Sequence, residues 1–87
     1  MSKIVFTEDG WQDYLFWQLQ DKKLLKKINE LLKDISRDNF NGIGKPEPLK
    51  NRYGCWSRRI DDCNRLVYKV SDDQIEVIQC KGHYEDK

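Results

Sequence analysis

The spacing of apolar and polar residues predicts a short strand followed by two helices. Residues 4–6 are an apolar run inside a predicted strand over 3–6, and we expect this run to be buried. Thr7 is a good helix N-cap, and the acidic Glu8 and Asp9 favour a first helical turn through the helix dipole. The first helix is therefore expected to run from this point to about Gln20.

The first helix carries an apolar stripe that we expect to face the core. Its members recur at helical spacing: Trp11, Tyr14, Leu15 and Leu19. Phe16 and Trp17 lie off this stripe, so they either widen the core contact or belong to a surface that meets a partner.

The second helix has the clearer pattern, and Asp21 can cap its start. Six apolar residues follow one face: Leu24, Leu25, Ile28, Leu31, Leu32 and Ile35. Polar residues follow the opposite face: Lys22, Lys23, Lys26, Asn29, Lys33 and Asp34. A zipper against a partner has the same spacing, but packing of an α-hairpin on a sheet is the favoured interpretation.

The C-terminal half is predicted to be a sheet that begins after a loop. Residues 39–48 are rich in Gly, Pro and Asn, which is typical of a loop. Three strand-like segments follow at 54–60, 65–70 and 74–80, and their short connections favour antiparallel pairing. The predicted order is β-α-α-β-β-β, an α+β fold with both N-terminal helices on one face of a mainly antiparallel sheet.

The alternation along the strand at 65–70 predicts which side chains meet the helices. Leu66, Tyr68 and Val70 share the more apolar face, whereas Arg65 shares the other face with Val67 and Lys69. We expect Arg59 to lie opposite Arg65, because a register shifted by one residue would bury an unpaired arginine.

Length and composition support one small globular domain over residues 1–87. The chain contains neither a secretory segment nor an apolar run long enough for a membrane span, which predicts a cytoplasmic protein without a membrane partner. Its three cysteines lack metal-ligand spacing, and reduced thiols are the simplest interpretation. We therefore expect neither a metal nor a cofactor.

Charge distribution is more informative than the net charge of +1. Residues 45–69 carry seven basic side chains against three acidic ones, a net charge of +4. Concentrated arginine and lysine suit phosphate binding, although a solvated charged face would have the same composition.

A small set of residues could carry out chemistry. His83 is the single histidine, and Tyr84 follows it. Glu47 lies between Pro46 and Pro48, which hold the local chain extended and could present the carboxylate at a fixed place. Each of these features alone is compatible with a tail or a surface turn. The chain lacks a phosphate-binding P-loop and a serine nucleophile motif.

RNA cleavage without a metal requires these residue types. A base takes the proton of a ribose 2′-hydroxyl, which attacks the adjacent phosphate, and an acid protonates the departing 5′-oxygen. Cations stabilise the pentavalent phosphorane, and the planar guanidinium of arginine can bind two of its oxygens. The ordinary pKa values of Glu, about 4.3, and His, about 6.5, suit a base and an acid near neutral pH.

Taken together, the motifs resemble those of the YoeB (Txe) toxins, a family of the RelE superfamily found in type II toxin–antitoxin systems. The resemblance rests on motifs spread over the chain: Trp11-x-x-Tyr14-x-x-Trp17, residues 21–31, residues 44–50, Trp56-Ser57-Arg58-Arg59-Ile60, Arg65-Leu66-Val67-Tyr68 and Gly82-His83-Tyr84. Each fragment is weak alone, but their order and spacing are specific together.

The resemblance implies a RelE-like microbial ribonuclease fold and a ribosome-dependent endoribonuclease that cuts mRNA in the A site of the 70S ribosome. Matching positions imply these roles: Glu47 as general base, His83 as general acid, Arg65 as the transition-state arginine, Lys50 and Arg59 as phosphate-binding residues, and Tyr84 as the aromatic that orients the substrate.

The resemblance also implies partners. A YefM-like antitoxin would cover the site, operator DNA would be bound only through that complex, and a homodimer is possible in this family. Two other functions stay open from the sequence. One is a catalytically weak RelE-fold module that acts by binding the ribosome or as a corepressor, and the other is a structural domain with a basic sheet face.

Overall fold

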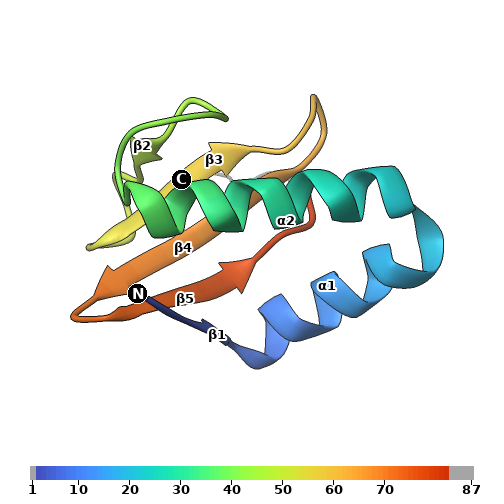
Figure 1. Ribbon diagram of the computed structural model, residues 1–87, viewed down its shortest axis with the longest axis horizontal. Coiled ribbons are helices and arrows are strands. Elements are labelled where there is room, and N and C mark those ends of the chain that lie inside the picture. Colours follow the sequence, from blue (N-terminus) through green and yellow to red (C-terminus); the bar gives the residue numbers. More distant parts are fainter. Residues whose placement is uncertain (1, 83–87) are drawn as a thin grey trace.

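The computed structural model describes residues 2–82 and contains two helices on one face of a five-stranded sheet (Figure 1). The elements follow one another as β1 (Lys3–Phe6), α1 (Glu8–Gln20), α2 (Lys22–Arg37), β2 (Glu47–Pro48), β3 (Cys55–Arg59), β4 (Arg65–Ser71) and β5 (Gln74–Gln79). The predicted α+β class and helix–sheet arrangement are confirmed. Among residues 2–82, no helix has both the length and the apolar character needed to span a membrane.

The strands lie in the order β1-β5-β4-β3-β2, so the first strand along the chain pairs with the last. β1 runs parallel to β5, and the other neighbours pair antiparallel as predicted. The prediction of a loop over residues 39–48 is wrong at its C-terminal end. Glu47 and Pro48 form the short edge strand β2, in which Glu47 pairs with Ser57.

Both helices begin at the predicted caps. The Thr7 hydroxyl accepts a hydrogen bond from the Gly10 amide at 3.0 Å, and the Asp21 carboxylate accepts one from the Leu24 amide at 3.1 Å. These side chains satisfy amide groups that have no partner within the first helical turn. The two caps therefore fix where the α-hairpin starts and where it bends.

The core lies between α2 and the inner face of the sheet. Its centre combines Ile28, Leu31 and Ile35 of α2 with Leu66 and Tyr68 of β4, all of them fully buried. The predicted inward face of β4 is thus confirmed for Leu66 and Tyr68. Val67 is also fully buried, although it belongs to the opposite face of the strand.

Two predictions about burial near the N-terminus are wrong. Ile4 is 40% exposed because β1 is an edge strand, and Leu19 is 84% exposed. The buried residues of α1 are Gly10 and Trp17, so the inward face of this helix is rotated from the predicted stripe. The indole Nε1 of Trp17 donates to the Cys80 carbonyl at 2.8 Å, which places Trp17 in the core contact.

Candidate active site on the outer sheet face

The carboxylate of Glu47 meets the guanidinium of Arg65 on the sheet face away from the helices. Arg65 Nη2 lies 3.2 Å from Glu47 Oε1, and Arg65 Nε donates to the Ser57 hydroxyl at the same distance. The strand register explains the meeting, because Glu47 pairs with Ser57 across β2 and β3. The Arg65 side chain is only 21% exposed, whereas Glu47 is 62% exposed. A cation is thus held in place beside an accessible carboxylate.

Arg59 lies directly opposite Arg65 in the β3–β4 pairing, as predicted. Its guanidinium, however, forms an ion pair with Asp62 in the following turn and not with Glu47. The two arginines are therefore paired across β3 and β4, but their guanidinium groups bind different carboxylates. Asp62 keeps Arg59 at the end of the sheet.

Lys50 lies just after β2 and is exposed, three positions beyond Glu47. The predicted residues His83 and Tyr84 lie outside the described residues. Gly82, which precedes them in the chain, is fixed beside Arg65. The Arg65 amide donates to the Gly82 carbonyl at 3.0 Å, and the Gly82 amide donates to Asn64 Oδ1 at 2.7 Å.

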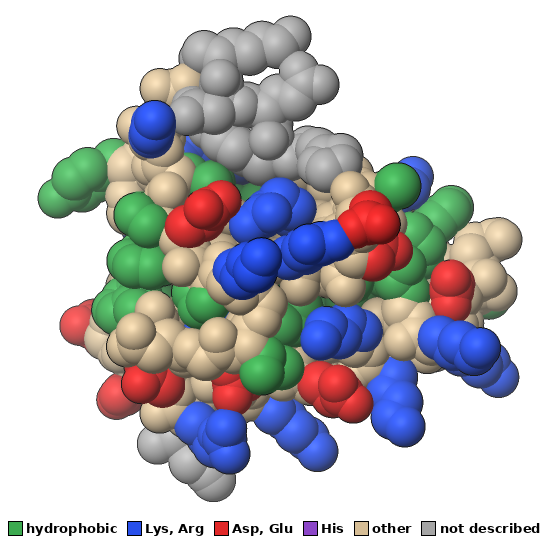
Figure 2. Space-filling model, turned by 90° about the horizontal axis from the view of Figure 1, so that it is seen from above, with side chains coloured by type: hydrophobic (Ala, Val, Ile, Leu, Met, Phe, Trp, Pro, Cys, Tyr) green, Lys and Arg blue, Asp and Glu red, His purple; other side chains and the backbone are tan. Residues whose placement is uncertain are grey.

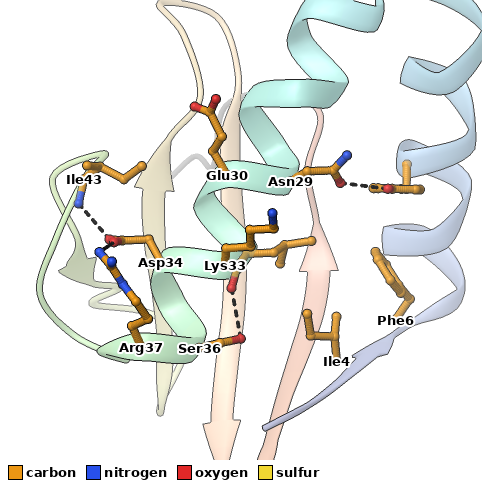
Figure 3. A pocket seen from close by; sticks show the side chains of 11 residues that line it. Ile4, Phe6, Asn29, Glu30, Lys33, Asp34, Ser36, Arg37 and Ile43 are labelled. Carbon is orange, nitrogen blue, oxygen red and sulfur yellow. Dashed lines mark hydrogen bonds and ion pairs between the residues drawn. The ribbon is translucent and has the colours of Figure 1, made fainter. Parts of the chain in front are cut away.

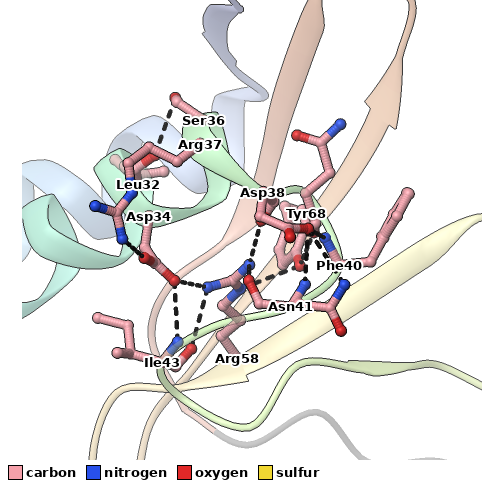
Figure 4. Close-up of polar contacts among 11 residues, drawn as sticks. Leu32, Asp34, Ser36, Arg37, Asp38, Phe40, Asn41, Ile43, Arg58 and Tyr68 are labelled. Atoms are coloured by element: carbon pink, nitrogen blue, oxygen red, sulfur yellow. Dashed lines mark hydrogen bonds and ion pairs between the residues drawn. The ribbon is translucent and has the colours of Figure 1, made fainter.

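A buried arginine lies behind the outer face (Figure 4). Arg58 is 0% exposed, and its Nη1 donates to Asp34 Oδ2 at 2.6 Å and to the Ile43 carbonyl at 3.1 Å. Its Nη2 donates to the carbonyls of Asp38 at 2.8 Å and Asn41 at 3.1 Å. The guanidinium therefore binds α2 and the loop that leads to Glu47 at the same time.

Further hydrogen bonds hold the same loop. The Tyr68 hydroxyl donates to the Asn39 carbonyl at 2.7 Å, and Asp34 Oδ2 also accepts from the Ile43 amide at 2.9 Å. These donors lower the pKa of Asp34, the Ile43 amide most and Arg58 next, whereas burial raises the pKa of Tyr68. The loop is thus fixed to the protein interior at several backbone positions.

The amphipathic pattern of the second helix did not predict this network, because it placed Asp34 on the exposed face of the helix. Asp34 is in fact only 8% exposed. One signal was available in the strand alternation: if Arg59 faces outward, its neighbour Arg58 must face the helices. That alternation predicts a buried arginine, and a buried arginine needs a carboxylate partner.

A separate apolar groove of about 1080 Å³ lies on the helix side (Figure 3). Ile4 and Phe6 of β1, Tyr14 of α1 and Leu32 of α2 contribute to its lining. The groove contains neither Glu47 nor Arg65, so it is separate from the candidate site. Within residues 2–82, no group of three or more His, Cys, Asp or Glu side chains is arranged to hold a metal ion.

Comparisons with known proteins agree on one family. Residues 6–84 match a family described as the YoeB-like toxin of bacterial type II toxin-antitoxin system. Toxin YoeB of Streptomyces coelicolor is 55% identical over 94% of this chain and 99% of its own length. Toxin YoeB of a Synechocystis species is 58% identical over 95% and 98% of the two chains.

Solved structures agree with the sequence matches. A YoeB/ParE toxin from Agrobacterium tumefaciens has a TM-score of 0.92 and 49% identity, covering 94% of this chain and 99% of that one. A YoeB dimer from Staphylococcus aureus has a TM-score of 0.90 and 49% identity, with coverages of 95% and 98%. A heterotetrameric YoeB-YefM toxin-antitoxin complex from S. aureus has a TM-score of 0.88 and 50% identity, with coverages of 97% and 99%.

Proposed function

Because the chain belongs to the YoeB-like toxins of bacterial type II toxin–antitoxin systems, we propose that it is a ribosome-dependent endoribonuclease that cuts mRNA in the ribosomal A site. The observation that carries this proposal is the Glu47–Arg65 pair, in which an accessible carboxylate lies beside an arginine held by Ser57. A basic group next to a fixed cation is what attack by a ribose 2′-hydroxyl on phosphate requires.

In the proposed reaction, Glu47 takes the proton from the 2′-hydroxyl of the nucleotide before the scissile bond. The 2′-oxygen attacks the adjacent phosphorus, and Arg65 stabilises the charge on the equatorial oxygens of the phosphorane. His83 gives a proton to the departing 5′-oxygen, leaving a 2′,3′-cyclic phosphate and a 5′-hydroxyl. The reaction uses no metal.

The remaining residues have supporting roles in this proposal. Lys50 and Arg59 bind substrate phosphates, and Tyr84 orients a base through stacking. The hydrogen bonds between Gly82 and the Asn64–Arg65 backbone and side chain support the assignment of His83, because they fix the preceding residue next to Arg65.

The partners follow from the relatives. The S. aureus YoeB-YefM complex supports a YefM-like antitoxin as the partner of this chain, and the S. aureus YoeB dimer supports a homodimer. We further propose that the protein acts in the cytoplasm and reaches operator DNA only through the antitoxin complex. Sedimentation of the chain alone and with its antitoxin tests both assemblies.

The decisive experiment maps mRNA cleavage on purified 70S ribosomes, using protein treated with a chelator and dialysed beforehand. We expect the cyclic-phosphate and 5′-hydroxyl ends, and no cleavage when the scissile nucleotide carries a 2′-deoxyribose. Replacing Glu47 by Gln should lower kcat by about 10²–10⁴-fold, since a positioned base contributes that much. Replacing Arg65 by Ala should lower it by about 10²–10³-fold.

Two variants on the same sheet face serve as controls. Glu76 and Lys69 pair with each other in the β4–β5 register, away from the Glu47–Arg65 pair, so Glu76→Gln and Lys69→Ala should leave kcat nearly unchanged. Unaltered cleavage by Glu47→Gln would remove Glu47 from the role of base. Growth arrest that persists in both the Glu47→Gln and Arg65→Ala variants would instead favour a module that acts by binding.

A further inference from the structure

A basic hollow of about 390 Å³ lies at the end of β3. Three cationic side chains from separate parts of the chain line it: Lys27 of α2, Lys45 of the loop before β2, and Arg59 of β3. On the face shown in Figure 2, Lys and Arg side chains gather near the middle, beside acidic side chains. We refer to this hollow as the Lys27–Lys45–Arg59 pocket.

The backbone of Lys45 is held in a conformation that lysine rarely adopts. Its φ is +51°, in the left-handed region, and the next residue is Pro46, which ordinarily favours an extended conformation in its predecessor. Such a conformation costs on the order of 1 kcal/mol or more and persists only when surrounding contacts impose it. Here the neighbouring Gly44 carbonyl accepts a hydrogen bond from the Arg59 amide at 2.6 Å, which fixes the loop at the pocket wall.

The acidic residues at the pocket, Asp61 and Asp62, do not pair with its two lysines. Asp61 Oδ1 accepts from the Cys63 amide at 2.8 Å and from Asn64 Nδ2 at 3.1 Å, and Asp62 pairs with Arg59. Within residues 2–82, by contrast, neither Lys27 nor Lys45 lies within 4.0 Å of a carboxylate oxygen. The two ammonium groups are therefore available to an anion.

We propose that the Lys27–Lys45–Arg59 pocket is a second phosphate subsite, which binds a backbone phosphate of RNA beside the Glu47–Arg65 pair. Arg59 connects the two places, because it lines the pocket and is the backbone partner of Arg65 in the β3–β4 pairing. RNA phosphates bound at the Glu47–Arg65 pair and at the end of β3 would thus lie close together. This inference rests on the proposed ribonuclease function, and the phosphate belongs either to mRNA or to ribosomal RNA.

The test measures binding in a Glu47→Gln background, in which RNA stays intact. The double variant Lys27→Ala/Lys45→Gly removes both ammonium groups, and glycine suits the positive φ at position 45, so the fold is retained. Fluorescein-labelled single-stranded RNA and empty 70S ribosomes are titrated separately at several KCl concentrations. Lys33→Ala, which removes one charge from another part of α2, controls for loss of charge alone, and Lys45→Arg restores the charge at the pocket.

We expect the double variant to bind about 5–30-fold more weakly, because each lost contact between an ammonium group and a phosphate removes an electrostatic contribution to affinity. The slope of log K against log [KCl] should become shallower by about 0.7 for each lost contact with a single-strand phosphate. Lys33→Ala should stay within about twofold of the parent, and Lys45→Arg should retain binding. An effect on free RNA assigns the phosphate to the substrate strand, and an effect on ribosomes alone assigns it to ribosomal RNA.

Affinities and slopes of the double variant equal to those of Lys33→Ala with both ligands would overturn the subsite. Failure of the proposed function would look different, because the unsubstituted protein would then leave ribosome-bound mRNA intact. The binding titrations do not depend on cleavage, so the two failures are distinguishable.

Discussion

Arg58 brings a positive charge into the interior, and its contacts satisfy that charge with one carboxylate and several backbone carbonyls. A buried ion pair of this kind does not by itself make a protein more stable than an apolar replacement would. Removing only one of the two partners is costly, however, because the remaining charge stays buried without a partner. Arg58 and Asp34 therefore behave as one unit.

Replacing Asp34 by Asn should lower the free energy of unfolding by about 3–5 kcal/mol at pH 7, since it leaves the Arg58 charge uncompensated. The folded state lowers the pKa of Asp34, so the contribution of its carboxylate is complete above the ordinary Asp pKa of about 4. That contribution is lost as the pH falls through the lower pKa of the folded state. Urea unfolding of both proteins between pH 7 and pH 3 measures the difference, which should shrink at the acidic end.

Asp73→Asn is the matched control, because Asp73 is exposed in the turn between β4 and β5. Its unfolding free energy should stay within about 0.5 kcal/mol of the parent protein at every pH. A pH-independent difference between Asp34→Asn and the parent would contradict the ionic role of Asp34.

At the residue scale, the sequence predicted the outward position of Arg59 and Arg65 but not the partners of their guanidinium groups. The strand alternation determines the face on which a side chain lies. The Arg59–Asp62 ion pair depends on the shape of a turn, and the Arg65–Glu47 contact depends on a loop closing into a strand. Neither the shape of that turn nor the pairing of that loop can be predicted from the local pattern of apolar and polar residues.

Among the elements, the loop between α2 and β2 connects the interior to the candidate base. Gly42 in this loop has a φ of +133°, and a Cβ built there would lie 1.9 Å from Asp34 Oδ2. The position therefore requires glycine for two separate reasons, its backbone conformation and the close approach of the Asp34 carboxylate. The close approach is what lets that carboxylate reach the Ile43 amide.

Replacing Gly42 by Ala should displace the Asp34 carboxylate and weaken both stability and cleavage. Gly54→Ala separates the two reasons, because Gly54 also has a positive φ of +80° but its added Cβ would meet only Lys69 Cε at 3.4 Å. We expect Gly54→Ala to cost about 1 kcal/mol from backbone strain alone, and Gly42→Ala to cost at least about 1 kcal/mol more. Thermal unfolding measures stability, and single-turnover mRNA cleavage below the melting temperature measures the effect on Glu47.

Equal losses of stability in the two variants would show that the close approach of Asp34 to position 42 adds nothing to the cost of a Cβ there. Normal cleavage by folded Gly42→Ala would show that the loop does not position Glu47.

The sequence predicted a loop here from its glycines and prolines, but the hydrogen bonds that fix it come from β3, β4 and α2. Those contacts are non-local, so no segment of sequence contains them.

For the molecule as a whole, the sheet runs from a partly exposed edge at β1 to a two-residue edge at β2. Local pattern predicted the helices, the antiparallel strands and the inward face of β4. It did not predict that β1 lies parallel beside β5, because that pairing joins residues about 70 positions apart, such as Phe6 and Val77. Backbone pairing across that separation is decided by the packing of the whole chain.

The uneven sheet predicts uneven protection of backbone amides from hydrogen exchange. Leu66, Tyr68 and Val77 lie in the fully buried centre, so their amides should exchange only through global unfolding. The amides near β2, including the Leu49 amide that donates to the Cys55 carbonyl, should exchange through a local opening at lower free energy. Native-state exchange at increasing urea measures both, and identical opening free energies in β2 and β4 would contradict the prediction.

Four carbonyl groups of the loop before Glu47, those of Asp38, Asn39, Asn41 and Ile43, accept hydrogen bonds from Arg58 and Tyr68. Every amino acid supplies a carbonyl, so these four contacts depend on the path of the backbone, whereas the Asp38 carboxylate is needed to accept from the amides of Phe40 and Asn41. During evolution, an exposed side chain whose residue is held through its backbone, such as Ile43, is free to change the outer surface, including any surface that a partner recognises. The position of the candidate base would be inherited unchanged while the identity of its inhibitor diverged.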